Sequence, residues 1–260
     1  MVGAVLAGVT LLLRSSMPES AVFTEARDSG ELPANPLRDV LRRQRRALIA
    51  TFAISALGSV TYYVGVTYVP TYLTSVSGFT DSAALTISTI AAVAVIAITP
   101  LAGHLADRFG RRPCLIALGL FFVLAPLGLF AFMSAGTWLR AVLGALILAF
   151  GAGAVSAAAA AAIPEQFATA GRLSGLALGY TLATAAFGGL APLVAQQAID
   201  ATGWRLFPGL LVMLVALAIL PVLWRLPETA RRPLATSPTQ VIVPAPRKPP
   251  ASLPNDAEVR

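Results

Sequence analysis

The chain has 260 residues, of which 57% are hydrophobic and only 12% are charged, and this composition excludes an ordinary water-soluble domain. The net charge is +7, but the basic residues lie between and beyond apolar runs rather than beside aromatic residues, which argues against a nucleic-acid-binding surface. The single cysteine, Cys114, cannot form an intramolecular disulfide, and the single histidine, His104, has too few acidic neighbours to build a metal site.

The amino-terminal apolar run, residues 1–13, is too short to cross a bilayer, because a spanning helix needs about 20 apolar residues. It also lacks the basic segment and the clear cleavage site of a signal peptide. Residues 14–46 form a polar connector, and residues 41–46 at its end predict a short basic amphipathic helix that lies on a membrane surface.

Six long apolar runs follow the connector, and each is long enough to cross a membrane. The predicted spans are 47–73, 82–102, 114–133, 138–163, 173–198 and 206–226. Several contain proline, which membrane helices tolerate because neighbouring helices satisfy the freed backbone groups. We therefore expect an all-α polytopic membrane protein with a six-helix bundle. Residues 227–260 are polar and rich in proline, so we expect a disordered tail.

The basic residues predict the orientation of this bundle. If the connector is cytoplasmic, seventeen of the 19 Lys and Arg residues lie on the cytoplasmic side, and only Arg140 and Arg205 lie outside. Without the tail, the ratio is still eleven to two. This asymmetry matches the positive-inside rule, so we expect both the connector and the tail to be cytoplasmic.

The most distinctive stretch, residues 103–113, lies between the second and third spans and has the sequence Gly-His-Leu-Ala-Asp-Arg-Phe-Gly-Arg-Arg-Pro. Its charged residues are Asp107, Arg108, Arg111 and Arg112. We expect a charged loop in which Gly103 and Gly110 allow close approach of the backbone. Asp107 is predicted to meet a helix N-terminus or an arginine, and so to favour one conformation of a two-state protein.

This stretch resembles the loop motif that transporters of the major facilitator superfamily carry between their second and third helices and again between their eighth and ninth. Other pieces resemble the metabolite:proton symporter branch, which includes 2-oxoglutarate, citrate, shikimate and proline/betaine permeases. These pieces are residues 18–23, 67–73, 175–180, 188–193 and 227–229. The resemblance implies the C-terminal six-helix half of a twelve-helix transporter, with residues 1–13 as the remnant of the preceding helix.

A second loop, between the fourth and fifth spans, also resembles the family. Glu165 and Arg172 match an acid and an arginine that the family has there, although Ala168 stands where the family often has proline. In the family, the charge contacts of the first motif stabilise one closed state of a gate, and the resemblance implies this role for residues 103–112 of this chain.

Within the spans, no ionisable residue lies near the middle of a helix, although such residues commonly carry coupled protons. We expect any proton-titrating group to lie in the other half of the transporter. The candidate substrate-facing residues are polar and aromatic: Ser55, Ser59, Tyr62, Tyr68, Tyr180 and Thr184. They could hydrogen-bond a carboxylate or attract a quaternary ammonium group, and the alternative is ordinary packing between helices.

The resemblance implies a proton-coupled symporter of a small organic acid or a zwitterionic osmolyte that works by alternating access in a bacterial inner membrane. Its expected partners are the lipid bilayer, the solute, protons and an N-terminal six-helix half, in the same or a separate chain. Because the solute site of this fold lies between two bundles, the isolated chain is predicted to be inactive in transport unless it pairs with a separate N-terminal half or with itself.

Two other classes of protein are alternatives. One is a non-transporting interaction or sensor protein of the same fold, which would use the connector and the tail for docking. The other is a membrane enzyme, but no Ser/His/Asp set, Cys/His set, phosphate loop or pair of buried carboxylates supports it. We therefore expect no catalysis and no cofactor.

Overall fold

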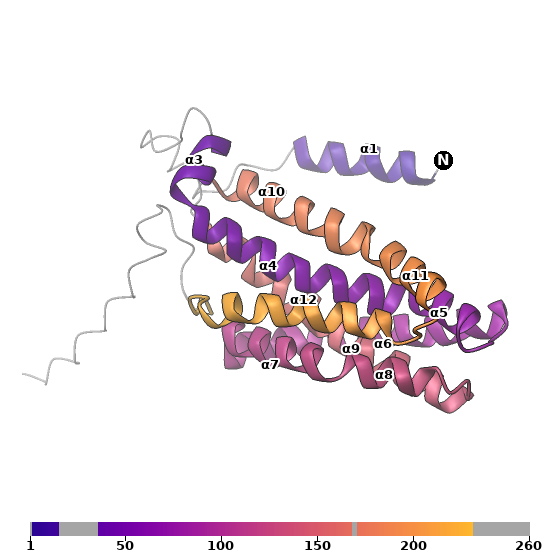
Figure 1. The fold of residues 1–260 in the computed structure, drawn as a ribbon. Helices are drawn as coiled ribbons and strands as arrows, with labels where there is room; N and C mark the ends of the chain where they lie inside the picture. The colour runs from indigo at the N-terminus through magenta and orange to yellow at the C-terminus, as the bar shows by residue number, and fades with distance from the viewer. Residues whose placement is uncertain (1, 16–35, 168–170, 231–260) are drawn as a thin grey trace, which may run out of the picture.

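A computed structural model describes residues 2–15, 36–167 and 171–230 of the chain. Every regular element in these ranges is helical (Figure 1), and the predicted all-α class is confirmed. The principal α-helices are α1 (Val2–Ser15), α3 (Pro36–Arg43), α4 (Arg45–Tyr62), α5 (Val69–Ser75), α6 (Asp81–Phe109), α7 (Arg111–Leu124), α8 (Pro126–Met133), α9 (Trp138–Ala162), α10 (Arg172–Thr184), α11 (Ala191–Thr202) and α12 (Phe207–Trp224).

Three short helical turns complete the described chain. They are the π-helical turns η1 (Tyr63–Thr67) and η4 (Ala185–Gly189) and the 3-10 turn η2 (Pro164–Gln166). Five helical segments are long and apolar enough to cross a membrane, and the bent pair of α7 and α8 makes a sixth if it is one span. The described part of the chain is therefore a bundle of membrane-spanning helices.

Proline explains where the spans bend or break. Pro126 begins α8, and the axes of α7 and α8 differ by 47° because proline cannot donate the backbone hydrogen bond that a straight helix needs. η1 and η4 each end three residues before a proline, Pro70 and Pro192 respectively. There the backbone forms wider turns, in which Tyr68 donates to Tyr63 and Leu190 donates to Ala185.

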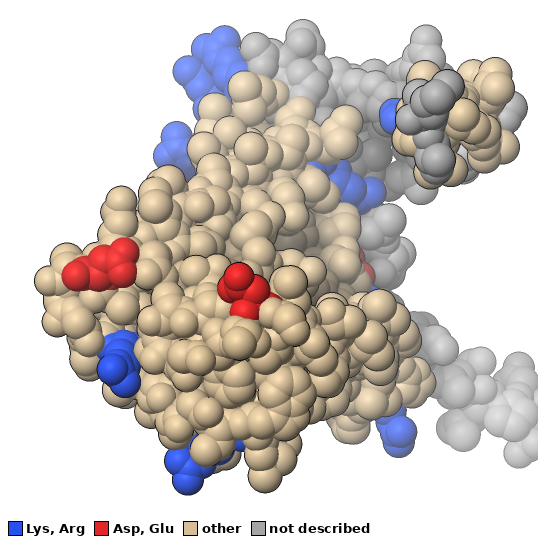
Figure 2. Space-filling model, turned by 90° about the vertical axis from the view of Figure 1, so that its right-hand side faces the viewer, with Lys and Arg blue, Asp and Glu red and all other residues tan. Residues whose placement is uncertain are grey.

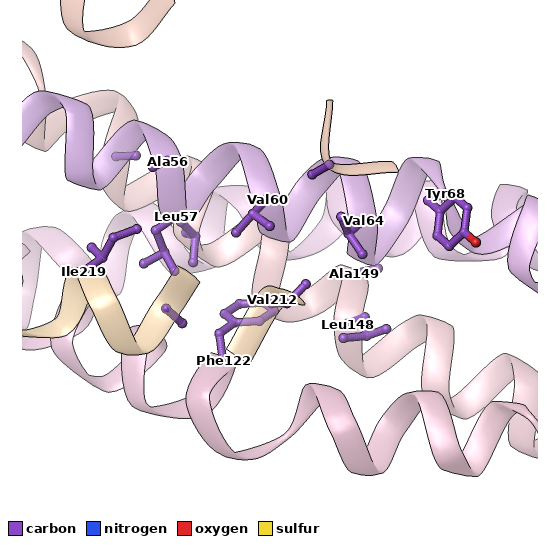
Figure 3. Packing of buried hydrophobic residues seen from close by; sticks show 14 of the residues in the cluster. Ala56, Leu57, Val60, Val64, Tyr68, Phe122, Leu148, Ala149, Val212 and Ile219 are labelled. Carbon is purple, nitrogen blue, oxygen red and sulfur yellow. The ribbon is translucent and has the colours of Figure 1, made fainter. Parts of the chain in front are cut away.

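The central helix of the bundle is α4, which packs against α9, α10 and α12. Figure 3 shows its residues Leu57 and Val60 close to Phe122 of α7 and to Val212 and Ile219 of α12. Further pairs are α6 with α9 and α12 with α7. These helix pairs hold the polar residues described below at fixed positions.

Small residues allow the helices to approach closely, which is how packing stabilises bundles in a lipid environment. A Cβ atom added to Gly151 of α9 would lie 2.7 Å from Cζ of Phe122. One added to Gly209 of α12 would lie 2.8 Å from the backbone of Leu127. Larger side chains at these positions would force the neighbouring helices apart.

The charged stretch, residues 103–113, was predicted to be a loop, but it is almost entirely helical. Helix α6 continues through Pro100 as far as Phe109, and α7 begins at Arg111, so only Gly110 lies outside the helices. Pro100 costs α6 one hydrogen bond without ending it. Gly110 alone changes the chain direction, with a φ of +108° that other residues rarely adopt.

Both polar segments that flank the bundle also differ from prediction. The basic amphipathic helix is α3, which ends at Arg43, and Arg45 and Arg46 already belong to α4. The first residues of the predicted disordered tail are instead packed, because Thr229 is buried against the bundle. Residues 16–35, 168–170 and 231–260, which include the 18–23 motif, Ala168 and most of the tail, lie outside the described residues.

The two ends of the bundle differ in charge. One end holds α3, the turn at Gly110, η2 and the residues that follow α12. We call it the arginine-rich end; its residues include Arg45, Arg46, Arg111, Arg112 and Arg225. Figure 2 looks onto the opposite end, near α5 and α8, which shows a mostly uncharged surface with a few separate acidic and basic residues.

Candidate functional site

Arg111 connects three helices at the arginine-rich end. Its Nη1 pairs with Oδ1 of Asp107, in the last turn of α6, and its Nη2 lies 3.2 Å from Oε1 of Glu165 in η2. The Arg111 and Glu165 side chains are only 13% and 19% exposed. Ion pairs that are this well shielded are screened less by salt than pairs on an open surface.

Glu228 joins the end of α12 to the start of α7. Its Oε1 accepts the backbone N–H of Arg111 at 3.0 Å, and its Oε2 accepts that of Arg112 at 3.1 Å. A carboxylate is favourable at a helix N-terminus, where the backbone amides lack partners in the helix. Glu228 therefore compensates for the two arginines that begin α7.

Both carboxylate oxygens of Glu165 accept hydrogen bonds. While one of its carboxylate oxygens faces Arg111, the other accepts the hydroxyl of Thr229 at 2.5 Å. Arg112 adds a further link, because its Nη2 donates to the carbonyl of Trp224 at 2.6 Å. We call Asp107, Arg111, Glu165, Glu228 and Thr229 the charged cluster; it ties the ends of α6, α7, α9 and α12 together.

Not all of the predicted charged residues join this cluster. The Arg108 guanidinium lies over the ring of Phe109, 5.7 Å from its centroid. Arg172 donates to the carbonyl of Phe167, and the described residues show no ion pair between it and Glu165. Gly103 has no neighbour within 4 Å of an added Cβ, so the close approach expected there is absent.

The role of Glu228 was not predicted from the sequence. Pro227, Glu228 and Thr229 resemble a family motif, but they were expected to belong to the tail. No local pattern shows that an acid 117 residues after Arg111 will meet it. The only available signal was the pair of arginines at the start of a helix, a position that calls for a negative partner.

A pocket of about 370 Å³ lies between α4, η1, α9 and α10. We call it the serine/tyrosine pocket; its lining residues are Ile54, Ser55, Gly58, Ser59, Tyr62, Tyr63, Ser156, Ala159, Ala160, Ile163 and Tyr180. None of them is charged. Four predicted substrate-facing residues, Ser55, Ser59, Tyr62 and Tyr180, therefore come together in one cavity.

The pocket contains a buried hydroxyl group that has no partner. Ser55 is 3% exposed, and its Oγ makes no hydrogen bond within the described part of the chain. By contrast, Ser59 Oγ lies 3.0 Å from Oγ1 of Thr184, which places Thr184 behind the pocket wall. Since buried polar groups nearly always have partners, Ser55 is available to a polar group that enters the pocket.

Tyr68 lies outside this pocket. Its hydroxyl donates to Oε1 of Gln196 at 2.6 Å, and Nε2 of Gln196 donates to Asp200 at 2.8 Å. These three residues link α11 to the segment after η1. Within the described ranges, no group of three or more His, Cys, Asp and Glu side chains could hold a metal ion.

Long apolar helices, a cavity between them and a charged cluster at one end define a polytopic membrane protein. The sequence profile of the Major Facilitator Superfamily matches residues 1–176 and 78–254. The chain belongs to this superfamily, as its motifs predicted, and therefore to a family of transporters rather than enzymes.

Three curated relatives indicate the branch of the family. The ectoine/proline transporter ProP of Corynebacterium glutamicum is 28% identical over 240 residues, which cover 88% of this chain and 47% of the relative. The citrate-proton symporter of Klebsiella pneumoniae is 29% identical, covering 80% and 46%. The alpha-ketoglutarate permease of Escherichia coli is 32% identical, covering 74% and 44%. The chain thus spans about half the length of these relatives.

Proposed function

We propose that the chain supplies one six-helix bundle of a proton-coupled solute transporter, and that the serine/tyrosine pocket forms part of the solute site. The relatives are transporters, and they include a citrate-proton symporter. Solute sites in such folds lie near the bilayer midplane between two bundles. A second six-helix half would complete the cavity and carry the proton-titrating group, because no charged residue lines this pocket.

The unpartnered hydroxyl of Ser55 is the observation that carries this proposal. A buried hydroxyl without a hydrogen bond costs about 1–3 kcal/mol. A polar group of the solute offsets this cost when it binds, whereas simple helix packing would leave the cost in place. Ser55 also shares the pocket with Ser59 and Ser156, so that hydroxyl groups come from α4 and α9.

The lining of the pocket favours a zwitterionic osmolyte over a tricarboxylate. Serine hydroxyls donate hydrogen bonds to a carboxylate, and the faces of tyrosine rings attract a quaternary or secondary ammonium group. Tyr62, Tyr63 and Tyr180 supply such rings. Citrate carries several negative charges and would meet no positive side chain on this wall.

The charged cluster is proposed to stabilise one of the two states of alternating access. It connects helix ends that must separate or slide when one end of the bundle opens. We infer that this arginine-rich end faces the cytoplasm of a bacterial cell, because the positive-inside rule places most arginines there. The non-transporting interaction or sensor protein is the alternative function.

Uptake of labelled proline, betaine and citrate into native membrane vesicles tests the proposal. We expect Ser55→Ala to raise the KM for the transported zwitterion about three- to tenfold, as loss of one hydrogen bond predicts. Ser75→Ala is the matched control, since this exposed serine lies outside the pocket and its hydroxyl donates to the carbonyl of Thr71 in its own helix. Equal KM values in both variants would contradict a solute contact at Ser55.

The charge-reversed variant Asp107→Lys separates the transporter from the sensor. Loss of uptake in this variant supports a conformational role of the charged cluster. If all variants lack uptake of every solute while a bound partner protein is lost from Asp107→Lys alone, the docking function replaces the transporter proposal.

A further inference from the structure

A second pocket, of about 570 Å³, opens at the arginine-rich end between the start of α4, η2 and the end of α12. We call it the basic pocket; its lining residues are Arg46, Ala47, Ile49, Ala50, Gln166, Val222, Arg225, Leu226 and Pro227. It shares no residue with the serine/tyrosine pocket or with the charged cluster. The basic pocket is therefore a separate candidate site.

Two arginines that lie far apart in the sequence, Arg46 and Arg225, both line this pocket. Arg46 lies in the first turn of α4, and Arg225 directly follows α12. Both side chains are exposed, and neither is paired with a carboxylate in the described part of the chain. Both Nη atoms of Arg111 already pair with carboxylates, whereas the guanidinium groups of Arg46 and Arg225 can accept an external anion.

The rest of the lining is mostly apolar. Ile49, Val222 and Leu226 supply hydrocarbon surface, and the amide of Gln166 already donates to the carbonyl of Ala162. Trp224, on the last turn of α12, is 52% exposed. Tryptophan is enriched at membrane–water interfaces, so its position predicts that the pocket lies at the depth of the lipid headgroups.

We propose that the basic pocket binds the headgroup of an anionic phospholipid. The two guanidinium groups would contact the phosphodiester, since arginine recognises phosphate through several hydrogen bonds. The apolar walls would contact the first carbons of the acyl chains. Basic pockets between membrane helices are suited to such headgroups.

A lipid fits this pocket better than a soluble anion does. Inorganic phosphate is small and fully polar, and it would leave most of this cavity and its hydrocarbon walls unused. Helix α3 lies just before Arg46 and adds Arg42 and Arg43 at the same end. These charges would attract an anionic leaflet as a whole, whereas Arg46 and Arg225 would select the lipid that occupies the pocket.

A bound headgroup would also reach the segments that hold the charged cluster. Gln166 and Pro227 line the basic pocket and directly adjoin Glu165 and Glu228 in sequence. The lipid would therefore hold η2 and the end of α12 together. We expect anionic lipid to stabilise the folded bundle more than neutral lipid does.

Native mass spectrometry of the full chain with phosphatidylglycerol or phosphatidylcholine tests this site. We expect wild-type protein to bind phosphatidylglycerol about tenfold more tightly than phosphatidylcholine, because the quaternary ammonium of choline would be repelled by the two guanidinium groups that contact the phosphodiester. The double variant Arg46→Gln/Arg225→Gln should lose this preference. The control Arg42→Gln/Arg45→Gln removes the same charge at the same end and should keep it.

Three outcomes would overturn the proposal. In the first, wild-type protein binds both lipids equally. In the second, the control variant loses as much preference as the pocket variant, which would indicate a diffuse charge effect. In the third, excess inorganic phosphate displaces phosphatidylglycerol, which would identify a site for a soluble anion. Thermal unfolding of each variant in detergent checks that all of them are folded.

Discussion

The carboxylate of Glu228 accepts the backbone amide of Arg111 at 3.0 Å, although the two residues are 117 positions apart in the chain. This contact places a negative charge at the start of α7, while the Arg111 side chain turns to Asp107 and Glu165. One residue thus uses its backbone and its side chain to join the last helix of the bundle to three others.

Neutralising Glu228 should destabilise the bundle. Glu228→Gln keeps the shape of the side chain but removes its charge from the helix N-terminus, which costs about 1 kcal/mol. We expect a lower midpoint of thermal unfolding in detergent, with a larger loss at low salt than at high salt. Asp200→Asn is the control at the opposite end and should change the midpoint little. A midpoint unchanged in Glu228→Gln would argue against a stabilising charge.

The two glycines of the charged stretch should respond differently to alanine. Gly110 has a φ of +108°, and an added Cβ would lie 2.5 Å from Oε2 of Glu228. We expect Gly110→Ala to cost about 2 kcal/mol of unfolding free energy from backbone strain and displacement of Glu228. Gly103 is helical with open space around it, so Gly103→Ala should be neutral or slightly stabilising. Chemical unfolding of both variants measures the difference.

A neighbouring pair of glycines in η4 offers a second comparison. A Cβ on Gly188 would lie 2.9 Å from the ring of Tyr63, whereas one on Gly189 would meet nothing within 4 Å. Gly188→Ala should cost about 1–3 kcal/mol through overpacking. It should also weaken solute binding, because Tyr63 lines the serine/tyrosine pocket. Similar stability and KM in the two alanine variants would refute this packing argument.

The proposed orientation predicts which residues an impermeant maleimide can reach. In a Cys114→Ser background, Arg225→Cys should be labelled in inverted membrane vesicles and Arg205→Cys in right-side-out vesicles. Both positions are exposed and lie at opposite ends of the bundle. The reversed labelling pattern would place the arginine-rich end outside the cytoplasm. Labelling of both residues after detergent treatment controls for reactivity.

The all-α fold class could be predicted from the sequence because apolar runs of bilayer length leave few alternatives. The face of Ser55, Ser59 and Tyr62 followed from the helical period. Tyr63 was missed, although it follows Ser59 by four residues and so lies on the same helical face as Ser59 and Tyr62. Which of the residues on this face line a cavity depends on how α9 and α10 pack against α4, which the helical period does not determine.

The charged cluster was only partly predictable for a different reason. Asp107 and Arg111 are close in sequence, and their pairing follows from local spacing. The contacts to Glu165, Glu228 and Thr229 depend on how α9 and α12 pack against α7, which local sequence does not determine. Arg172 matched a family motif by type and position, but the start of α10 directs it to Phe167 instead.

Because Glu228 follows α12, its contacts with α7 can form only late in the synthesis of the chain. The start of α7 is synthesised early, yet its backbone amides can gain the Glu228 carboxylate only after α12 has been synthesised. Until then, Asp107 and Glu165 are the carboxylates that can pair with Arg111. The contacts of Glu228 with the start of α7 therefore form late in biogenesis, after α12 has entered the bilayer.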